Sequence, residues 1–292
     1  MLLSPVQSRS YWQILLTLGR VSNLPTVWSN CIAGWLLAGG GSALGLLVLC
    51  LGATCLYFGG MFLNDAFDAE FDRLHRRERP IPAGLISPDA VWRWGFAWLG
   101  TGTVLLVLLG NSTGAFAALL LFSIILYDAV HKLVASAPVL MAACRFFLVL
   151  TAASVGVNGV AGLAIWHALA LAVYIIGLST LARHENSKSA LPRWPALLLA
   201  VPLLLALLAN AGEYRLRSSL QVMVVALWIL RCLQPAMMTR EINVRRSVEG
   251  LLAGIILIDW LALGSDAGFG ASLALLLLFF LALVLQRWVP AT

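Results

Sequence analysis

Long apolar stretches follow one another along most of this chain, and no other feature constrains its fold as strongly. A helix needs about 20 mostly apolar residues to cross a bilayer, and lipid offers its backbone no hydrogen bonds. We therefore predict an all-α, polytopic transmembrane helix bundle that forms a single domain over residues 1–292. The ten predicted helices are residues 21–39, 43–63, 89–109, 113–131, 138–157, 162–182, 194–211, 218–236, 247–264 and 270–288.

Composition excludes the other broad classes. Hydrophobic residues make up 61% of the 292 positions and charged residues only 11%, against roughly 25% charged in soluble proteins. The five cysteines all lie in apolar stretches, so neither a zinc site nor a disulfide framework is expected. The net charge of +6 fits attraction to anionic lipid headgroups better than nucleic-acid binding. We expect membrane lipids, and no nucleic acid, as partners.

The positions of lysine and arginine predict the orientation. Of the 19 lysines and arginines, Arg215 and Arg217 fall on one side of the predicted bundle and Arg145 lies inside a span. All the others lie on the side of the N-terminus. Because cytoplasmic loops carry the excess of positive charge, we place the N-terminus and its neighbouring loops in the cytoplasm, and we expect a bacterial inner membrane.

The loop after the second predicted helix carries an acidic segment. If that helix continues, Asn64, Asp68 and Asp72 follow at four-residue intervals, with Asp65 on the same face. Clustered carboxylates repel one another unless a cation lies between them, and hard oxygen ligands suit Mg²⁺. The pattern predicts that Asn64, Asp65, Asp68 and Asp72 bind Mg²⁺.

Basic residues follow the acidic segment directly. Arg79 precedes a Pro-x-Pro-x-Gly run, which should form a stiff turn toward the third predicted helix. Guanidinium groups bind phosphate in a bidentate manner, so this half of the loop suits a diphosphate. The alternative is a solvated loop that only obeys the charge rule, which explains the arginines but not the alignment of the acidic face.

These motifs resemble a known family. Asn-Asp-x-x-Asp-x-x-x-Asp from residue 64 and Arg-Pro-Ile-Pro-Ala-Gly from residue 79 are similar to the first Asp-rich motif of the UbiA superfamily of membrane prenyltransferases. Residues 19–28 resemble the family's first-helix segment, and residues 127–132 resemble its Tyr-x(4)-Lys segment. The resemblance covers the first nine helices in order, which implies nine UbiA-like spans plus a tenth.

The resemblance implies a Mg²⁺-dependent prenyltransferase. Such enzymes bind an isoprenyl diphosphate at a cavity that faces the cytoplasm and transfer the prenyl group to an aromatic or other lipophilic acceptor within the membrane. Metal ions and arginines stabilise the charge that develops on the leaving diphosphate. By resemblance the metal site comprises Asn64, Asp65, Asp68 and Asp72; the catalytic residues are Asp65, Asp68, Asp72 and Lys132; Asn23 and Arg79 contact the diphosphate; and Tyr127 lines the site.

One departure from the family leaves the function open. UbiA-type enzymes carry a second Asp-rich motif after helix six, but no aspartate lies between Asp128 and Asp259 here. We expect Arg183, Glu185 and Lys188 in that place, and Arg145 from inside a span, to contact the diphosphate instead. The alternative function is a non-catalytic UbiA-like binder or transporter of a prenylated or aromatic small molecule. An unrelated secondary transporter is disfavoured, because the glycine pairs of the first half lack partners in the second.

Overall fold

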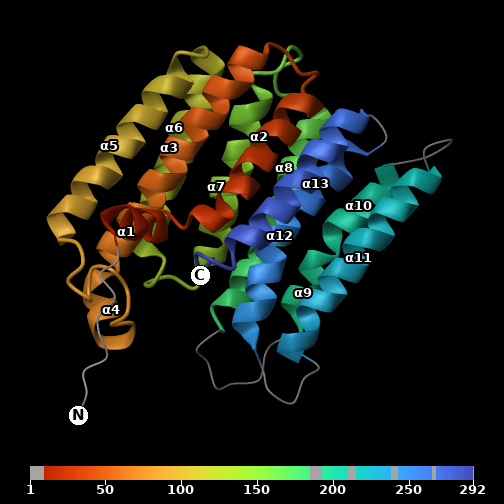
Figure 1. Cartoon of the computed structure of the whole chain (residues 1–292). Helices are drawn as coiled ribbons and strands as arrows, with labels where there is room; N and C mark the ends of the chain where they lie inside the picture. Colours follow the sequence, from red (N-terminus) through yellow and green to blue (C-terminus); the bar gives the residue numbers. More distant parts are fainter. Residues whose placement is uncertain (1–9, 185–192, 210–214, 238–242, 265–267, 292) are drawn as a thin grey trace.

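Helices account for every regular element that the computed structural model describes, which covers residues 10–184, 193–209, 215–237, 243–264 and 268–291. Figure 1 shows the long helices side by side. Their bounds are α1 Tyr11–Leu18, η1 Val21–Asn23, α2 Leu24–Leu37, α3 Ala43–Phe67, α4 Ala69–His75, α5 Pro88–Val107, α6 Asn111–Val130, α7 Ala137–Ala153, α8 Gly162–Ala182, α9 Trp194–Leu199, α10 Val201–Ala209, α11 Arg215–Met237, α12 Val244–Leu263 and α13 Phe269–Leu285.

Over its described residues, each predicted apolar stretch coincides with one or two helices. The stretch at residues 194–211 is divided into α9 and α10, because Pro202 lacks the N–H that would bond to the carbonyl of Leu198. Within the described part of the chain, the helices long and apolar enough to cross a membrane are α3, α6, α8 and residues 218–236 of α11. The all-helical fold is therefore confirmed, while the count of nine or ten spans remains a prediction.

The helices pack in two connected groups. In the first, α3 lies along α5, and α6 contacts both of them; in the second, α12 contacts α8, α11 and α13. Helices α2 and α7 join the groups, because α2 contacts α3 and α12, and α7 contacts α6 and α8. A Cβ on Gly102 of α5 would lie 2.7 Å from the carbonyl oxygen of Gly52 in α3. Small residues thus permit the close approach of these two helices.

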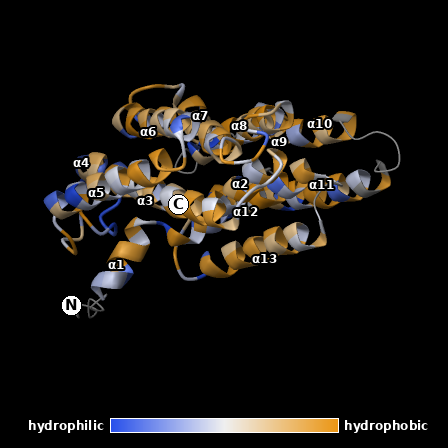
Figure 2. Ribbon diagram, turned by 90° about the horizontal axis from the view of Figure 1, so that it is seen from above, coloured by the Kyte–Doolittle hydropathy of each residue, from blue (hydrophilic) through white to orange (hydrophobic). Residues whose placement is uncertain are grey.

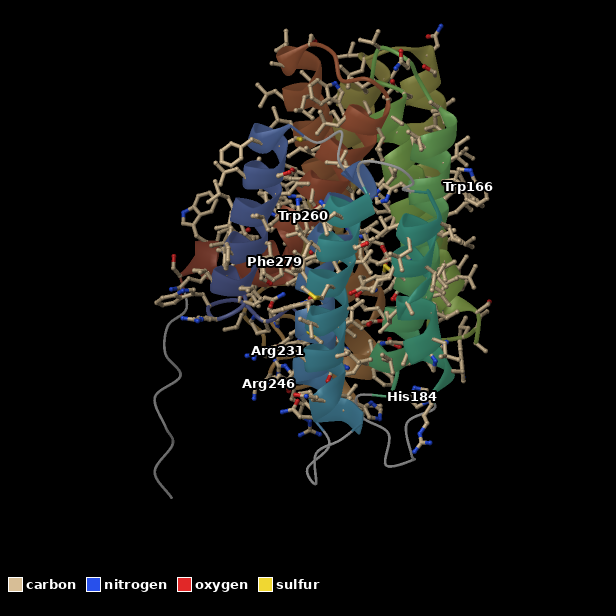
Figure 3. The ribbon with its side chains drawn as sticks, turned by 90° about the vertical axis from the view of Figure 1, so that its right-hand side faces the viewer. Trp166, His184, Arg231, Arg246, Trp260 and Phe279 are labelled. Carbon is tan, nitrogen blue, oxygen red and sulfur yellow. The ribbon has the colours of Figure 1, made fainter. Side chains whose placement is uncertain are left out.

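Polar and basic residues mark one end of the bundle. Figure 2 shows hydrophobic colour over most helices and hydrophilic colour gathered around α4 and the start of α5. Arg246 and His184 lie at one end in Figure 3, whereas Trp166 and Trp260 lie toward the other. Helix α4 lies at the same end as the start of α12, which carries Arg246. The acidic segment and this basic end therefore share one side of the molecule.

Candidate active site

The acidic segment forms the junction of α3 and α4. Helix α3 ends at Phe67, and Asp68 links it to α4 with φ −81° and ψ −6°. The backbone N–H of Asp68 donates to Asn64 O at 3.0 Å, and that of Asp72 donates to Asp68 O at 2.8 Å. The four-residue hydrogen-bond spacing thus continues through the junction. Asn64, Asp65, Asp68 and Asp72 are all buried, with Asp72 only 2% exposed.

Arg79 returns to the two ends of the acidic segment. Its Nη1 lies 2.8 Å from Asp65 Oδ1 and 3.2 Å from Asp72 Oδ2. The predicted turn produces this return: the N–H of Ala83 donates to Arg79 O at 2.9 Å, and Gly84 adopts φ +72°. A positive φ favours glycine, which has no Cβ to clash with the backbone. The sequence Pro80–Gly84 therefore positions the arginine against the carboxylates.

Arg20 is a second arginine at the site, and sequence reasoning gave it no role. Its Nη2 lies 3.2 Å from Asn64 Oδ1 and 3.0 Å from Asp65 Oδ1. Arg20 is the one non-glycine residue with positive φ, +41°, among the described residues, and the Tyr57 hydroxyl donates to its carbonyl at 3.1 Å. Such a conformation costs about 1–3 kcal/mol and concentrates at functional sites. The signal that could have identified Arg20 is its place within residues 19–28, the segment that resembles the first helix of the UbiA superfamily.

The C-terminal end of α6 and the residues after it supply two more cationic or ionisable groups. Lys132 Nζ lies 2.6 Å from Asp68 Oδ1, and His131 Nε2 lies 3.4 Å from the same oxygen. Lys132 also lies 3.9 Å from the ring centre of Phe71, and the Tyr127 ring stacks on His131 at 5.0 Å. The predicted Tyr127 and Lys132 are thus brought to the acidic segment, and His131 joins them.

Asp128 is a further carboxylate of the site that sequence reasoning did not select. It is 3% exposed, and its Oδ1 accepts a hydrogen bond from Asn64 Nδ2 at 3.2 Å. Its Oδ2 is buried without a hydrogen-bond partner among the described residues. Asp128 precedes His131 and Lys132 by three and four residues, so one face of the helix end presents all three. That spacing was visible in the sequence and would have identified Asp128.

The surroundings shift the pKa values of two aspartates in opposite directions. Burial acts to raise the pKa of Asp68, but hydrogen bonds to His131 and Lys132 outweigh it, and the pKa lies below its usual value. Burial raises the pKa of Asp72 above its usual value; the guanidinium of Arg79 opposes this rise, and the carboxylate of Asp68 adds to it. Of these two aspartates, Asp68 is therefore the one whose surroundings favour the ionised form.

The donor set fits Mg²⁺, although its carboxylates do not converge as they stand. Among the described residues, no three carboxylate, imidazole or thiol groups form a ready cation site, because Arg20, Arg79 and Lys132 lie against the aspartates. The available ligands are nonetheless carboxylate and amide oxygens, which Mg²⁺ prefers. The buried, unpartnered Asp128 Oδ2 is a further oxygen at this place. A divalent cation is the group that these residues suit.

Three predicted substrate contacts donate hydrogen bonds to groups other than the acidic segment. Asn23 donates through Nδ2 to Ala291 O at 2.9 Å. Arg183 Nη1 donates to Ala135 O at 2.6 Å. Arg145 donates to the carbonyl and hydroxyl oxygens of Thr26 and to Asn30 Oδ1 rather than to the acidic segment. The other two predicted contacts, Glu185 and Lys188, lie outside the described residues.

Arg145 is part of a separate polar cluster inside the bundle. Asp259 of α12 is 0% exposed and accepts hydrogen bonds from Ser29 and Asn30 of α2 and from His167 of α8. Arg145 of α7 reaches the same Asn30 at 2.8 Å. We call the six residues of this group the sealed cluster: Thr26, Ser29, Asn30, Arg145, His167 and Asp259. It joins four helices.

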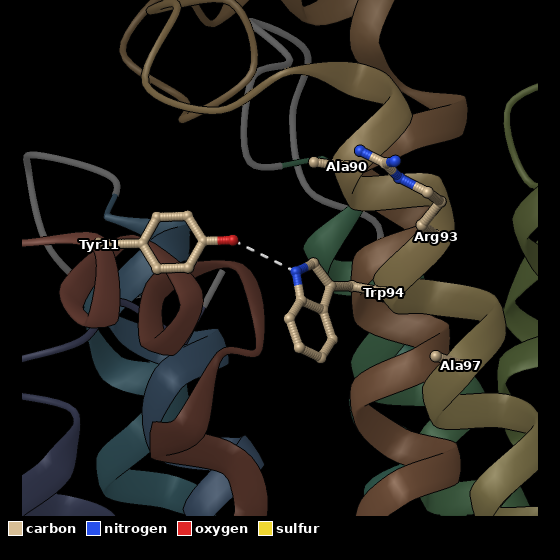
Figure 4. Close-up of a pocket in the computed structure, with 5 residues that line it drawn as sticks. All are labelled: Tyr11, Ala90, Arg93, Trp94 and Ala97. Carbon is tan, nitrogen blue, oxygen red and sulfur yellow. Dashed lines mark hydrogen bonds between the residues drawn. The ribbon is translucent and has the colours of Figure 1, made fainter.

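A cleft on the outside of the bundle contains none of these acidic residues. It measures about 390 Å³ and lies between α1 and α5, where Tyr11, Ala90, Arg93, Trp94 and Ala97 line it. Figure 4 shows Trp94 donating through its indole N–H to the Tyr11 hydroxyl. The cleft offers one cation and no carboxylate, so it lacks the groups that the metal chemistry needs.

Comparison with known proteins assigns the fold and its motifs to a family. Residues 24–290 match the sequence profile of the UbiA prenyltransferase family. This chain belongs to that family. A digeranylgeranylglyceryl phosphate synthase from Methanothrix thermoacetophila is 36% identical over an alignment of 114 residues that covers 35% of this chain and 41% of that protein. The enzyme of that name from Pyrococcus horikoshii is 40% identical over 65 residues, 21% of this chain and 24% of that protein. The chain thus matches less than half the length of these relatives.

Solved structures of UbiA homologues share the fold over most of their length. A homologue from Aeropyrum pernix K1 superimposes with a TM-score of 0.63 at 19% identity, covering 80% of this chain and 94% of that one. A homologue from Archaeoglobus fulgidus bound to GPP and Mg²⁺ gives 0.54 at 14% identity, covering 94% and 99%. At these identities the likeness establishes the UbiA fold.

Proposed function

We propose that this protein is a Mg²⁺-dependent membrane prenyltransferase that moves an isoprenyl group from its diphosphate to an aromatic or other lipophilic acceptor. One observation carries the proposal: the buried face of Asn64, Asp65, Asp68 and Asp72 meets Arg20, Arg79 and Lys132 within hydrogen-bonding distance. Ligands for a metal and cations for a diphosphate therefore occupy one place. Membership of the UbiA family supports the reaction class.

The basic side chains of the site can bind either of two anions, the carboxylates of the acidic segment or a diphosphate. Arg20, Arg79 and Lys132 now neutralise the carboxylates. If the carboxylates bind Mg²⁺, the same three side chains can donate to diphosphate oxygens, where guanidinium groups form short, charge-assisted bonds. Bound Mg²⁺ supplies positive charge that stabilises the leaving diphosphate. We further propose that Arg183, Glu185 and Lys188 contact the diphosphate from beyond α8, and that Asn23 does so after releasing its present partner. Arg145, which donates to Thr26 and Asn30, is not included in this proposal.

The surrounding helices protect the reactive group. Apolar side chains of α2, α3 and α6, such as Leu24, Leu63 and Leu120, form one buried cluster, and Leu63 directly precedes Asn64 in α3. An allylic cation formed among such side chains is shielded from water, which would otherwise capture it before the acceptor does. The membrane therefore serves as both the solvent for the substrates and the barrier to hydrolysis.

The relatives suggest which acceptor and which membrane to test. Two of them are named digeranylgeranylglyceryl phosphate synthase, so we propose a prenylated glyceryl phosphate as the first acceptor, with aromatic compounds beside it. The charge asymmetry supports a cytoplasmic N-terminus and active site. The matching relatives come largely from archaea, so we propose a cytoplasmic membrane without restricting it to a bacterial inner membrane.

Release of diphosphate tests the proposal directly. Purified protein in lipid would receive geranyl, farnesyl or geranylgeranyl diphosphate, with and without Mg²⁺ and with both classes of acceptor. We expect release that requires Mg²⁺ and is lost in Asp68→Ala, while Glu70→Ala, which removes an exposed carboxylate two residues away, stays active. Mg²⁺-dependent binding of the diphosphate without release would instead favour the alternative, a non-catalytic binder or transporter, which the missing aspartates after α8 motivate.

A further inference from the structure

We propose that Asp128 is an additional oxygen ligand of the cation site, which it approaches from α6 while the acidic segment approaches from α3 and α4. The inference rests on the proposed function, because it assigns a residue to the same metal. The family motif at residues 127–132 requires only its tyrosine and lysine, so the resemblance does not supply a role for the carboxylate between them.

The first step of the argument is the orientation of Asn64. Its amide donates through Nδ2 to Asp128 Oδ1 at 3.2 Å, while its Oδ1 lies 3.2 Å from Arg20 Nη2. The carboxylate of Asp128 therefore fixes which end of the amide faces Arg20, the arginine that also contacts Asp65: the oxygen, not the nitrogen. An oxygen on that side is what a hard cation requires.

The second step is the free oxygen of Asp128. Oδ2 is buried and has no hydrogen-bond partner among the described residues, although Asp128 is only 3% exposed. A buried carboxylate oxygen without a partner is costly, and native proteins rarely leave one without a purpose. The charged groups that act on Asp128 are Arg20, Asp68 and Asp65, all of the proposed site. A cation bound between these aspartates would supply the missing partner.

The third step is the distribution of ligands around the ion. Asn64, Asp65, Asp68 and Asp72 all belong to one continuous helical segment, and they approach a cation from one side. The chain has no aspartate between Asp128 and Asp259, so the usual second acidic motif does not provide the opposite side. Asp128 is the carboxylate that contacts the acidic segment from another helix within the described residues. It thus supplies a ligand from the other side.

The experiment measures binding of Mn²⁺, a paramagnetic substitute for Mg²⁺, by the full chain in lipid nanodiscs without any prenyl diphosphate. Free Mn²⁺ is counted by electron paramagnetic resonance for the wild type, Asp128→Asn and the control Glu70→Gln. The asparagine retains an acceptor for Asn64 Nδ2 but loses the anionic oxygen. We expect Asp128→Asn to weaken Mn²⁺ binding by at least about tenfold, with unchanged thermal unfolding of the metal-free protein, and Glu70→Gln to bind as the wild type does.

A second variant keeps the test valid if Asp128→Asn fails to fold. Asp128→Cys replaces a hard ligand by a soft one, so the preference for Cd²⁺ over Mn²⁺ should rise by about tenfold or more relative to the wild type. A residue that only packs or orients Asn64 would not change this preference. Equal Mn²⁺ binding by wild type and Asp128→Asn, or an unchanged Cd²⁺ preference, would overturn the inference and leave the proposed function intact. Absence of Mn²⁺ binding by the wild type would overturn both.

Discussion

The acidic segment and the sealed cluster both hold carboxylates within a hydrophobic bundle, but they satisfy them in different ways. Asp65, Asp68 and Asp72 pair with charged side chains, and these remain partly accessible, with 15% of the Arg79 side chain and 32% of the Lys132 side chain exposed. Asp259 is 0% exposed and receives its hydrogen bonds from a hydroxyl, an amide and an imidazole. The acidic segment thus keeps partial access to water through its basic partners, whereas Asp259 has none.

The difference separates a site that can exchange partners from a network that holds helices together. An arginine that keeps partial access to water, such as Arg79 with 15% of its side chain exposed, can exchange a carboxylate for another anion, because the incoming anion and water replace the partner it leaves. A buried carboxylate surrounded by fixed donors has no such alternative, and losing a partner there is expensive. We therefore expect mutations in the acidic segment to affect catalysis first, and mutations in the sealed cluster to affect stability first.

Asp65→Ala should have the largest effect on the reaction rate, and it tests the catalytic role that the comparison assigns to the acidic segment. Asp65 is the carboxylate that contacts both Arg20 and Arg79, so its loss removes a proposed metal ligand and disorganises two diphosphate contacts. We expect the rate of diphosphate release to fall by roughly 10³-fold, the scale seen when a preorganised charge-stabilising group is lost. The free energy of unfolding, measured by SDS titration in mixed micelles, should fall less than it does for Asp259→Ala, because Arg79 keeps Asp72 as a partner and both arginines keep partial access to water.

Asp259→Ala should give the largest effect on stability. The change leaves Asn30 and His167 without this acceptor inside the bundle, while the Ser29 hydroxyl keeps the carbonyl of Thr26. Each orphaned buried donor costs about 1–3 kcal/mol, so we expect the free energy of unfolding to fall by about 3 kcal/mol. Asp259→Asn should lose less, because it keeps one acceptor oxygen. The proposed difference between the two groups is wrong if Asp259→Ala has the unfolding free energy of the wild type, or if Asp65→Ala loses as much unfolding free energy as Asp259→Ala does.

Arg145→Met tests a residue that the sequence analysis predicted at the diphosphate site, whereas the structure places it in the sealed cluster. The guanidinium donates to Thr26 and Asn30, and hydrogen bonds to charged groups contribute about 1.5–3 kcal/mol. We expect a loss of about 2 kcal/mol in unfolding free energy, with KM for the prenyl diphosphate and Mn²⁺ affinity unchanged. A tenfold rise in KM with normal stability would return Arg145 to the diphosphate site, as the sequence predicts.

The features that could be predicted from the sequence are those that depend on residues close together along the chain. The apolar stretches located the helices, the four-residue spacing placed Asn64, Asp68 and Asp72 on one face, and the proline–glycine run predicted the turn that returns Arg79. These features depend on helix periodicity and local backbone preference.

Contacts between distant elements could not be predicted in the same way. Arg20 reaches Asp65 across 45 positions, and Arg145 reaches Thr26 and Asn30 across more than 100 positions. Which helix faces which decides these pairs, and that depends on packing rather than on spacing along the chain. Asp128 is intermediate: its helical register with Lys132 was visible, but its contact with Asn64 was not.

Arg79→Lys should give the smallest effect and sharpen the comparison within the acidic segment. The Arg79 guanidinium contacts both Asp65 and Asp72 through Nη1. Lysine keeps the charge but has no planar, multidentate group, so it should bind a diphosphate less well. We expect the rate of diphosphate release to fall by about tenfold, which corresponds to about 1.4 kcal/mol, with the unfolding free energy close to that of the wild type.

Arg77→Lys is the matched control for this change, because Arg77 is exposed and its Nε donates to the main-chain carbonyl of Arg73 rather than to a carboxylate. Its rate should stay within about twofold of the wild type, since an exposed side chain of this kind contributes little. If both variants slow the reaction equally, the basic loop acts only through its total charge. If Arg79→Lys alone is slow, the geometry of the guanidinium matters, as expected for a group that moves from carboxylates to diphosphate.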